Sequence, residues 1–246
     1  MKHSCPTFAA LTLLAASVHA YEPAGTPGDW PMPMMGNHPY GMLMGDRLEA
    51  GFADEADTYV WDVQGWYGGD GDRWWLKTEG EGETGQSPDD AELQLLFSRM
   101  LAPYWDWQVG VRHDFRPQPD RSHLVFGVQG IAPYEFEIDT ALFLSDEGDV
   151  TGRFEAEYDL RITQRLILQP RLELNAAFSD DPEIGLASGI NATELGLRLR
   201  YELRRELAPY IGIAWERFHG GTADLAQAEG EPTSSTSLVI GVRAWF

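Results

Sequence analysis

The C-terminal segment Ser235–Phe246 reads STSLVIGVRAWF and alternates apolar with polar or small side chains up to the final carboxylate. Alternation with a period of two is the pattern of a β-strand that has one apolar and one polar face. The apolar face carries Leu238, Ile240, Val242, Ala244 and Phe246. A chain that ends on an aromatic strand of this kind indicates an outer-membrane β-barrel. Soluble sheets alternate as well, so the rest of the chain must repeat the pattern.

The N-terminus is typical of an exported protein. Lys2 and His3 precede an apolar run over residues 8–16, and small residues follow at 17–20, as in a secretory signal with cleavage before Tyr21. No segment reaches the roughly 18 to 20 uninterrupted apolar residues that a membrane-spanning helix needs. The only cysteine, Cys5, falls within the signal, so we expect a mature chain without a thiol, a disulfide or a lipid anchor.

The charge balance is strongly acidic, with 18 basic and 39 acidic residues. Nucleic acid is excluded as a partner, because phosphate binding depends on clustered Lys and Arg. Cations are the plausible ligands. The alternative is that acidic loops keep an exported protein soluble and face the lipopolysaccharide of the outer membrane.

The same alternation recurs along the whole chain and predicts about twelve strands, each near the ~9 to 11 residues of a tilted spanning strand. They are expected at 45–52, 57–67, 73–79, 91–99, 105–115, 122–131, 134–144, 150–160, 166–178, 194–203, 209–218 and 235–246. Five of the connections are brief, and they alternate with longer polar insertions such as 80–90, 179–193 and 220–234. Short periplasmic turns that alternate with long extracellular loops are typical of these barrels. The predicted fold is therefore all-β: a transmembrane antiparallel up-and-down β-barrel over 45–246, preceded by a signal peptide at 1–20 and a short irregular segment at 21–44.

One face of the predicted strands is charged and cannot contact lipid, so it must line the lumen. The carboxylates expected to hold or conduct cations there are Glu135, Glu137, Asp139, Glu155, Glu157 and Asp159. Arginines share this face, among them Arg112, Arg153, Arg171, Arg198 and Arg200. The alternative is that these arginines neutralise the carboxylates in purely structural ion-pair ladders.

Methionine is concentrated just before the predicted barrel. Within residues 30–44 the candidate metal ligands are Met32, Met34, Met35, His38, Met42 and Met44. Thioether sulfur is a soft donor suited to Cu(I), and imidazole binds copper in either oxidation state, so this segment is a candidate copper site. The alternative is a plug that fills the barrel mouth, because methionine adapts to irregular space.

The histidines of the barrel are weaker candidates. His123 is predicted to point into the lumen, where neighbouring carboxylates would complete a metal site, although a hydrogen-bonded wall residue is the simpler interpretation. His113 is predicted to face outward, and His219 to open a solvated extracellular loop. Some twelve-stranded barrels are phospholipases with an outward Ser and His. No such pair is evident here, since Phe115 stands two residues after His113, and catalysis is not expected.

From about Met42 onward the chain resembles the copper resistance protein B family of proteobacterial outer-membrane proteins. The resemblance rests on the stretches Gly65–Asp70, Leu76–Glu81, Ala91–Arg99, Gly110–Pro117, Ala141–Asp146, Glu155–Arg161, Thr163–Arg171 and Glu194–Tyr201. It implies a barrel that binds copper, works with a periplasmic multicopper oxidase in copper tolerance and helps to move copper outward. Many members carry long Met-Asp-His repeats before the barrel, whereas this chain has one short cluster, which implies few copper sites.

The sequence thus predicts a non-enzymatic outer-membrane protein that captures periplasmic copper, with Cu(I) favoured. Two alternatives stay open at this point. A nonspecific small porin would conduct solutes without a preference for copper, and a structural barrel filled by its own side chains would conduct nothing.

Overall fold

The structure is a computed structural model that describes residues 39–53, 56–230 and 232–246. Its strands are β1 (Tyr40–Phe52), β2 (Thr58–Gly68), β3 (Asp72–Glu83), β4 (Asp90–Ala102), β5 (Trp105–Arg116), β6 (Arg121–Ala132), β7 (Phe136–Ser145), β8 (Val150–Tyr158), β9 (Leu160–Arg161), β10 (Leu166–Ala177), β11 (Gly189–Tyr201), β12 (Leu207–Phe218) and β13 (Ser234–Trp245). Three short helices are η1 (Pro133–Glu135), η2 (Pro182–Ile184) and α1 (Gly220–Glu229). No helix in these ranges has the length and hydropathy that crossing a membrane requires.

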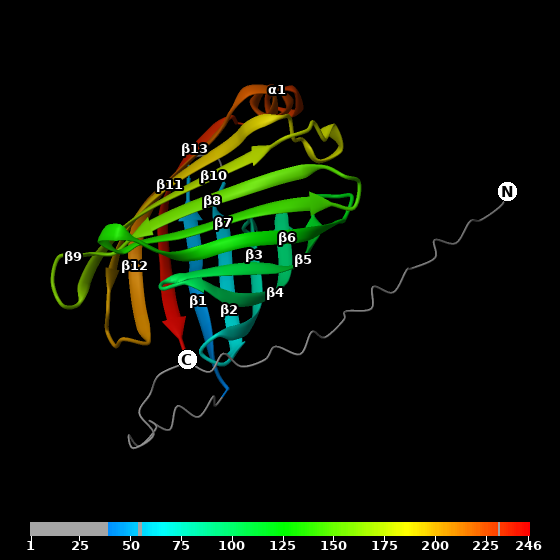
Figure 1. Cartoon of the computed structure of the whole chain (residues 1–246). Coiled ribbons are helices and arrows are strands. Elements are labelled where there is room, and N and C mark those ends of the chain that lie inside the picture. The colour runs from blue at the N-terminus through cyan, green and yellow to red at the C-terminus, as the bar shows by residue number, and fades with distance from the viewer. Residues whose placement is uncertain (1–38, 54–55, 231) are drawn as a thin grey trace, which may run out of the picture. The chain divides into compact units, whose positions relative to one another are not determined.

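The strands form one closed antiparallel sheet (Figure 1). Each strand pairs with its neighbours in chain order, and β1 closes the ring against β13. β8 and β9 are two segments of one strand, interrupted at Asp159, because both pair with β10. The wall is therefore a twelve-stranded barrel, which confirms the predicted fold class.

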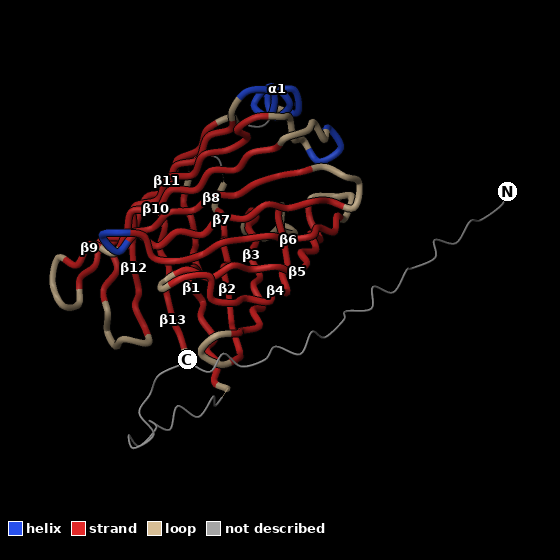
Figure 2. Tube along the Cα trace, in the orientation of Figure 1, coloured by secondary structure: helices blue, strands red, loops and turns tan. Residues whose placement is uncertain are grey.

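The C-terminal residues form the last strand of the wall, as their alternating pattern predicted. Phe246 N donates to Leu43 O at 2.8 Å, and Leu43 N donates to Phe246 O at 3.0 Å, so the last residue still pairs with β1. The end of the barrel where β1 begins and β13 ends carries the five short connections, and we call it the turn end. The opposite end, the loop end, carries α1 and η2 (Figure 2). In outer-membrane barrels the short turns are periplasmic, which assigns the turn end to the periplasm.

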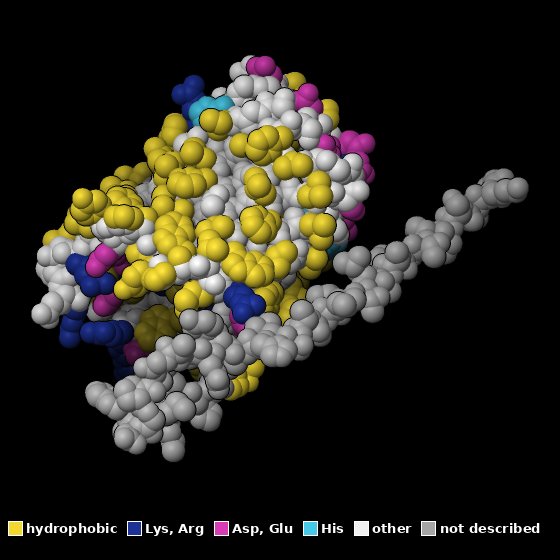
Figure 3. Space-filling model, viewed as in Figure 1, with side chains coloured by type: hydrophobic (Ala, Val, Ile, Leu, Met, Phe, Trp, Pro, Cys, Tyr) yellow, Lys and Arg dark blue, Asp and Glu magenta, His cyan; other side chains and the backbone are white. Residues whose placement is uncertain are grey.

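The wall separates apolar from polar side chains as predicted. Leu95 is 47% exposed on the outer face, whereas the next residue, Leu96, is 1% exposed on the inner face. Apolar side chains cover the outside of the wall (Figure 3). Polar and charged residues are buried inside it, among them Glu49, Gln108, Arg171 and Arg198. This is the inverse of a soluble domain and fits a wall whose outside contacts lipid.

Three strand boundaries and one connection differ clearly from the sequence prediction. β1 begins at Tyr40, so Met42 and Met44 lie within the barrel wall and not before it. β3 continues to Glu83 because Gly80 and Gly82 lie under the rings of Trp61 and Tyr59, where a larger residue would clash. β11 begins at Gly189, and α1 occupies part of the expected loop over 220–234. Glycine is typical of loops, but Gly80 and Gly82 accommodate aromatic rings from the neighbouring strand.

Candidate functional site

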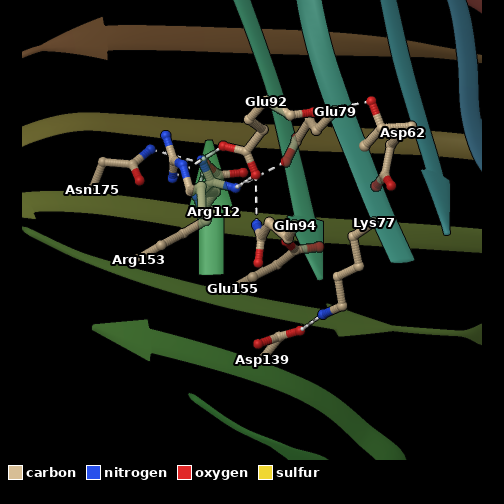
Figure 4. A network of polar contacts seen from close by, with 12 residues as sticks. Asp62, Lys77, Glu79, Glu92, Gln94, Arg112, Asp139, Arg153, Glu155 and Asn175 are labelled. Carbon is tan, nitrogen blue, oxygen red and sulfur yellow. Dashed lines mark hydrogen bonds and ion pairs between the residues drawn. The ribbon is translucent and has the colours of Figure 1, made fainter. Parts of the chain in front are cut away.

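Ion pairs cross the interior of the barrel (Figure 4). Arg153 on β8 reaches Glu79 on β3, with Nη1 to Oε2 at 2.8 Å, and Glu92 on β4, with Nη2 to Oε2 at 3.0 Å. Its Nε also lies 3.6 Å from Glu173 on β10. Strands β4 to β7 separate β3 from β8 along the wall, so the contacts with Glu79 and Glu92 span the bore, whereas Glu173 lies on the strand next to β8.

Two further arginines extend this arrangement around the interior. Arg171 is 3% exposed and pairs with Glu155 at 2.9 Å and with Glu194 at 3.0 Å. Arg47 pairs with Glu79 and lies 3.5 Å from the same Glu194. We call the connected set the bore network: Arg47, Arg153, Arg171, Glu79, Glu92, Glu155, Glu173 and Glu194. Side chains from six strands meet in it, so charged groups from several parts of the wall come together inside the bore.

Every carboxylate of the bore network has a basic partner, and its five carboxylates share three arginines. Each carboxylate in it lies within 4.0 Å of at least one guanidinium, as buried charges require. Apolar side chains adjoin it, since Arg112 lies over the Phe143 ring at 4.6 Å and Phe143 packs with Trp75, Leu96 and Val125. Trp75, Leu96, Val125 and Phe143 thus form an apolar part of the inner wall beside the bore network.

The predicted cation-facing carboxylates fall into two groups. Asp139 pairs with Lys77 at 2.8 Å, Glu155 with Arg171 at 2.9 Å and Asp159 with Arg200 at 2.6 Å. Glu157 accepts a hydrogen bond from Gln169 at 2.9 Å and lies 3.3 Å from Arg171. These four are structural partners of basic or amide groups, in line with the ion-pair alternative.

Glu137 and Glu135 differ from those four. Within the described residues neither makes an ion pair. Glu137 lines the cavity described below. The structure places Glu135 in η1 with a φ of 65°, ahead of the first residue of β7, and its side chain is exposed at the turn end. The chain turns at Pro133 and Tyr134, so Glu135 belongs to the connection and not to the lumen-facing row.

A cavity of about 540 Å³ occupies the turn-end half of the bore. It extends from residues beside the short turns, such as Asp70 and Tyr104, to Glu79 and Arg153 of the bore network. Carboxylates outnumber basic groups in its lining. The cavity therefore favours a cation over an anion.

Methionine sulfur is present at this cavity. Met44 on β1 and Met100 on β4 both line it. Met44 Sδ accepts a hydrogen bond from Arg243 Nη2 at 3.5 Å, and Met100 is 54% exposed. Met42 lies two residues before Met44, on the same side of β1. Every methionine within the described ranges thus lies at the turn-end mouth.

The remaining predicted ligands of the N-terminal segment, Met32, Met34, Met35 and His38, lie outside the described residues. Sequence reasoning missed Met100. The signal was available in the alternation of β4, because Met100 has the same phase as Gln94, Leu96 and Ser98, which face the interior.

His123 points into the interior, as predicted, and is 8% exposed. Its Nδ1 lies 3.6 Å from Asp114 Oδ2, and its ring meets Phe143 edge-on at 6.3 Å. Among the residues that the structure describes, no three His, Cys, Asp or Glu side chains converge to hold a metal ion. These surroundings favour the interpretation of His123 as a wall residue.

The expectation that no outward Ser and His pair exists is wrong. His113 on β5 and Ser122 on β6 are cross-strand neighbours on the lipid-facing side, with Nδ1 to Oγ at 3.0 Å. The partner of His113 comes from the next strand, so the spacing within one strand could not reveal it. In the described part of the chain no carboxylate contacts the second ring nitrogen, and the Phe115 ring lies edge-on to the imidazole at 4.6 Å. The pair therefore lacks the third group that orients a catalytic base.

His219, predicted to be solvated, is half-buried. His219 immediately precedes α1, and its Nε2 lies 2.9 Å from Thr193 Oγ1 on β11. This contact connects the β12–β13 connection to β11 at the loop end and brings no further metal ligand.

Comparisons with known proteins identify relatives of one family, copper resistance protein B. The profile of a family described as copper resistance protein B precursor matches residues 39–246. Copper resistance protein B of Escherichia coli is 45% identical over 205 residues, which is 83% of this chain and 69% of the relative. A copper resistance protein B homolog of Pseudomonas syringae pv. tomato is 41% identical over 204 residues, with the same coverage. Among solved structures, the porin NanC superposes with a TM-score of 0.54 at 15% identity, covering 82% of this chain and 98% of the porin, and this likeness supports the barrel fold.

Proposed function

The chain belongs to the copper resistance protein B family, and from this premise we propose that it captures periplasmic copper with thioether and imidazole groups at the turn-end mouth of its barrel. Family membership and the barrel establish a role in copper resistance and a location in the outer membrane. The identity of the ligands and the fate of the copper are the proposed part.

One observation carries the proposal: Met42, Met44 and Met100 all lie at the mouth of the interior, and none lies on the lipid-facing belt. A methionine that served only as an apolar side chain would be equally favourable on the lipid-facing side of the wall. Thioether sulfur prefers soft ions, so Cu(I) is the favoured form. The acidic lining of the same cavity attracts cations toward the sulfur atoms.

Copper would reach this mouth from the segment that precedes β1. Met32, Met34, Met35 and His38 are close in sequence to Met42, and we propose that they take up copper first. A periplasmic multicopper oxidase is the partner that the family suggests for handling Cu(I) on this side of the membrane.

The bore network is relevant to the two alternative functions, a nonspecific porin and a structural barrel that conducts nothing. A nonspecific porin needs an open lumen, whereas Arg153, Glu79 and Glu92 form ion pairs across the bore, which supports a narrowed one. We therefore favour capture and retention at the mouth as the resting activity. Export would require the bore network to rearrange. No enzymatic activity is proposed, because the His113 and Ser122 pair has no base-orienting group among the described residues.

The test is a Cu(I) competition titration with a chromogenic chelator on the refolded mature protein. Three sets of substitutions are compared: Met32, Met34 and Met35→Leu with His38→Ala; Met42→Leu with Met44→Leu; and Met100→Leu. Leucine keeps volume and apolarity, so folding should be retained. We expect the first set to lower the stoichiometry and the second and third to weaken the remaining affinity roughly tenfold. Wild-type binding in all three sets would refute the proposal. Single-channel recording of the wild type should show a closed barrel, and a stable open conductance would support the porin alternative.

A further inference from the structure

Four arginines project from two neighbouring turns at the turn end. Arg161 and Arg165 flank the β9–β10 turn, and Arg204 and Arg205 lie in the β11–β12 turn. All four side chains are exposed. We call this set the arginine rim. Figure 3 shows basic side chains gathered at the end of the barrel where β9 and β12 lie.

Hydrogen bonds make the two turns one ordered surface. Glu202 N donates to Arg165 O at 2.8 Å, which joins the turns directly. Thr163 Oγ1 accepts from the backbone N–H groups of Arg165 and Leu166 at 3.2 and 2.9 Å and fixes the first turn. Trp245 Nε1 donates to Arg205 O at 2.7 Å and holds the second turn against β13. The guanidinium groups therefore extend from a preorganised backbone.

The arginine rim differs from the other arginines of the barrel. Those in the bore, such as Arg47, Arg171 and Arg198, are paired with carboxylates. Within the described residues, none of the four rim arginines makes an ion pair. The chain has a net charge of −21, yet these four guanidinium groups pair with none of the described carboxylates. This arrangement indicates a surface that binds an anion outside the barrel.

The surroundings of the rim match a membrane interface. Leu160, Ile162 and Leu203 are 47%, 53% and 55% exposed, and they adjoin Arg161 and Arg204 in sequence. Leu203 continues the lipid-facing row of β11, which ends at Tyr201, and the Trp245 side chain reaches the neighbouring turn through Arg205 O. Aromatic side chains mark the headgroup level in outer-membrane barrels. The arginines thus lie where the apolar belt ends and phosphate groups begin.

We propose that the arginine rim binds the phosphate groups of anionic phospholipids in the periplasmic leaflet. Guanidinium binds phosphate through two parallel hydrogen bonds, and adjacent arginines accommodate the two charges of a pair of headgroups. The exposed Leu and Ile side chains contact the acyl chains of the same lipids. A soluble acidic protein would satisfy the charge but would leave these apolar side chains without a partner, so lipid is the occupant that the surface favours.

The test measures lipid selectivity of the folded barrel in detergent. Dansyl-labelled phosphatidylglycerol and dansyl-labelled phosphatidylcholine are titrated separately, and energy transfer from tryptophan reports binding, with Trp245 next to the site. We expect the wild type to prefer phosphatidylglycerol. Each arginine near an anionic surface is worth roughly a fivefold gain in affinity. The double variants Arg161→Gln with Arg165→Gln, and Arg204→Gln with Arg205→Gln, should each lose at least roughly tenfold for phosphatidylglycerol.

The matched control is Arg116→Gln with Arg217→Gln. These two arginines lie at the loop end and also make no ion pair among the described residues, so the change in net charge is the same. Retention of wild-type selectivity in the control, together with its loss in the rim variants, supports the proposal. Equal loss in all the doubles would mean a general charge effect, and a wild type without preference between the two lipids would overturn the proposal and leave an acidic protein as the candidate partner. Copper binding is not involved in any arm, so failure here is independent of the proposed function.

Discussion

Arg153 Nη1 lies 2.8 Å from Glu79 Oε2, although the two side chains start from strands that β4 to β7 separate along the barrel wall. This contact shows that side chains of nearly opposite walls meet in the bore. One guanidinium serves Glu79, Glu92 and Glu173 together. Removing it would leave three carboxylates in a confined space with reduced compensation.

We expect Arg153→Gln to lower the free energy of unfolding by about 3 kcal/mol, since breaking a buried ion pair leaves uncompensated charge. Urea titration of the refolded barrel measures this change. The same variant should give a larger single-channel conductance than the wild type, because the bridge across the bore is lost. The control is Arg99→Gln, which breaks an exposed pair with Asp72 and should cost less than about 0.5 kcal/mol. Equal losses in the two variants would contradict the central role of Arg153.

A glycine on β13 makes room for an aromatic ring on β12. A Cβ at Gly241 would lie 2.5 Å from the ring of Tyr210, whose hydroxyl donates to Glu49 at 2.9 Å. Gly241→Ala should therefore cost about 2 kcal/mol, because the ring must shift and strain this hydrogen bond. Thermal or urea unfolding checks the value. Gly71→Ala, where a Cβ meets nothing within 4 Å, should be close to neutral. The cost of Gly241→Ala should also largely disappear in a Tyr210→Ala background, and its persistence there would disprove the steric explanation.

The carboxylates of the turn-end cavity should separate into a cation-binding and a structural kind. Glu137 lines the cavity without an ion pair among the described residues, whereas Asp139 is 2.8 Å from Lys77. We expect Glu137→Gln to weaken the binding of Tb³⁺, a hard cation that prefers carboxylate oxygen, by roughly threefold without loss of stability. Asp139→Asn should instead lower the free energy of unfolding by about 1 kcal/mol, since it leaves Lys77 without its carboxylate. Tryptophan-sensitised Tb³⁺ luminescence and urea unfolding read out the two effects, and a reversed pattern would refute this division.

The sequence predicted the wall of the barrel well, because lipid on one side and charge on the other impose a period of two on every strand. The inward arginines of β10 and β11, Arg171 and Arg198, were assigned to the correct face for this reason. The partners of those arginines were not predictable. Which carboxylate contacts Arg153 depends on how the twelve strands close into a barrel. No local sequence pattern specifies which residues then face each other across the bore.

The sequence did not predict three other features, and each has its own physical reason. Register between neighbouring strands sets the contact of His113 with Ser122, so it is invisible within either strand alone. α1 begins at Gly220 and Gly221, which read as loop residues, although the alanines that follow favour a helix. The start of β1 was hidden by prolines at 31, 33 and 39, which disfavour a strand up to, but not beyond, Tyr40.

His123 should behave as a structural residue. It is nearly buried between Asp114 and Phe143, and replacing it with alanine removes both contacts. We expect His123→Ala to lower the free energy of unfolding by about 1 to 2 kcal/mol and to leave Cu(I) and Cu(II) affinities within twofold of the wild type. Chelator competition with each ion measures affinity, and Met42→Leu with Met44→Leu is the comparison that should lose Cu(I) binding. A selective loss of Cu(II) in His123→Ala would instead make it a ligand.

Arg121 holds the β10–β11 connection at the loop end. It is 6% exposed, and its guanidinium pairs with Glu147 at 2.8 Å, Glu183 at 3.1 Å and Asp181 at 3.3 Å. These contacts attach η2 and the β7–β8 turn to the first residue of β6. With Arg121→Gln the connection over 178–188 loses its only shared cation among the described residues, so local opening should become easier by roughly tenfold while the barrel itself stays folded.

Limited digestion with thermolysin, which cleaves before large apolar residues, tests this prediction at Ile184 and Leu186. Cleavage there should be roughly tenfold faster in Arg121→Gln than in the wild type, as expected when a protease acts on a transiently open segment. Arg116→Gln is the control, because Arg116 lies at the same end and makes no ion pair in the described part of the chain. Equal cleavage rates in the two variants would show that backbone hydrogen bonds such as Asp181 N to Leu186 O, at 2.9 Å, are sufficient to hold the connection.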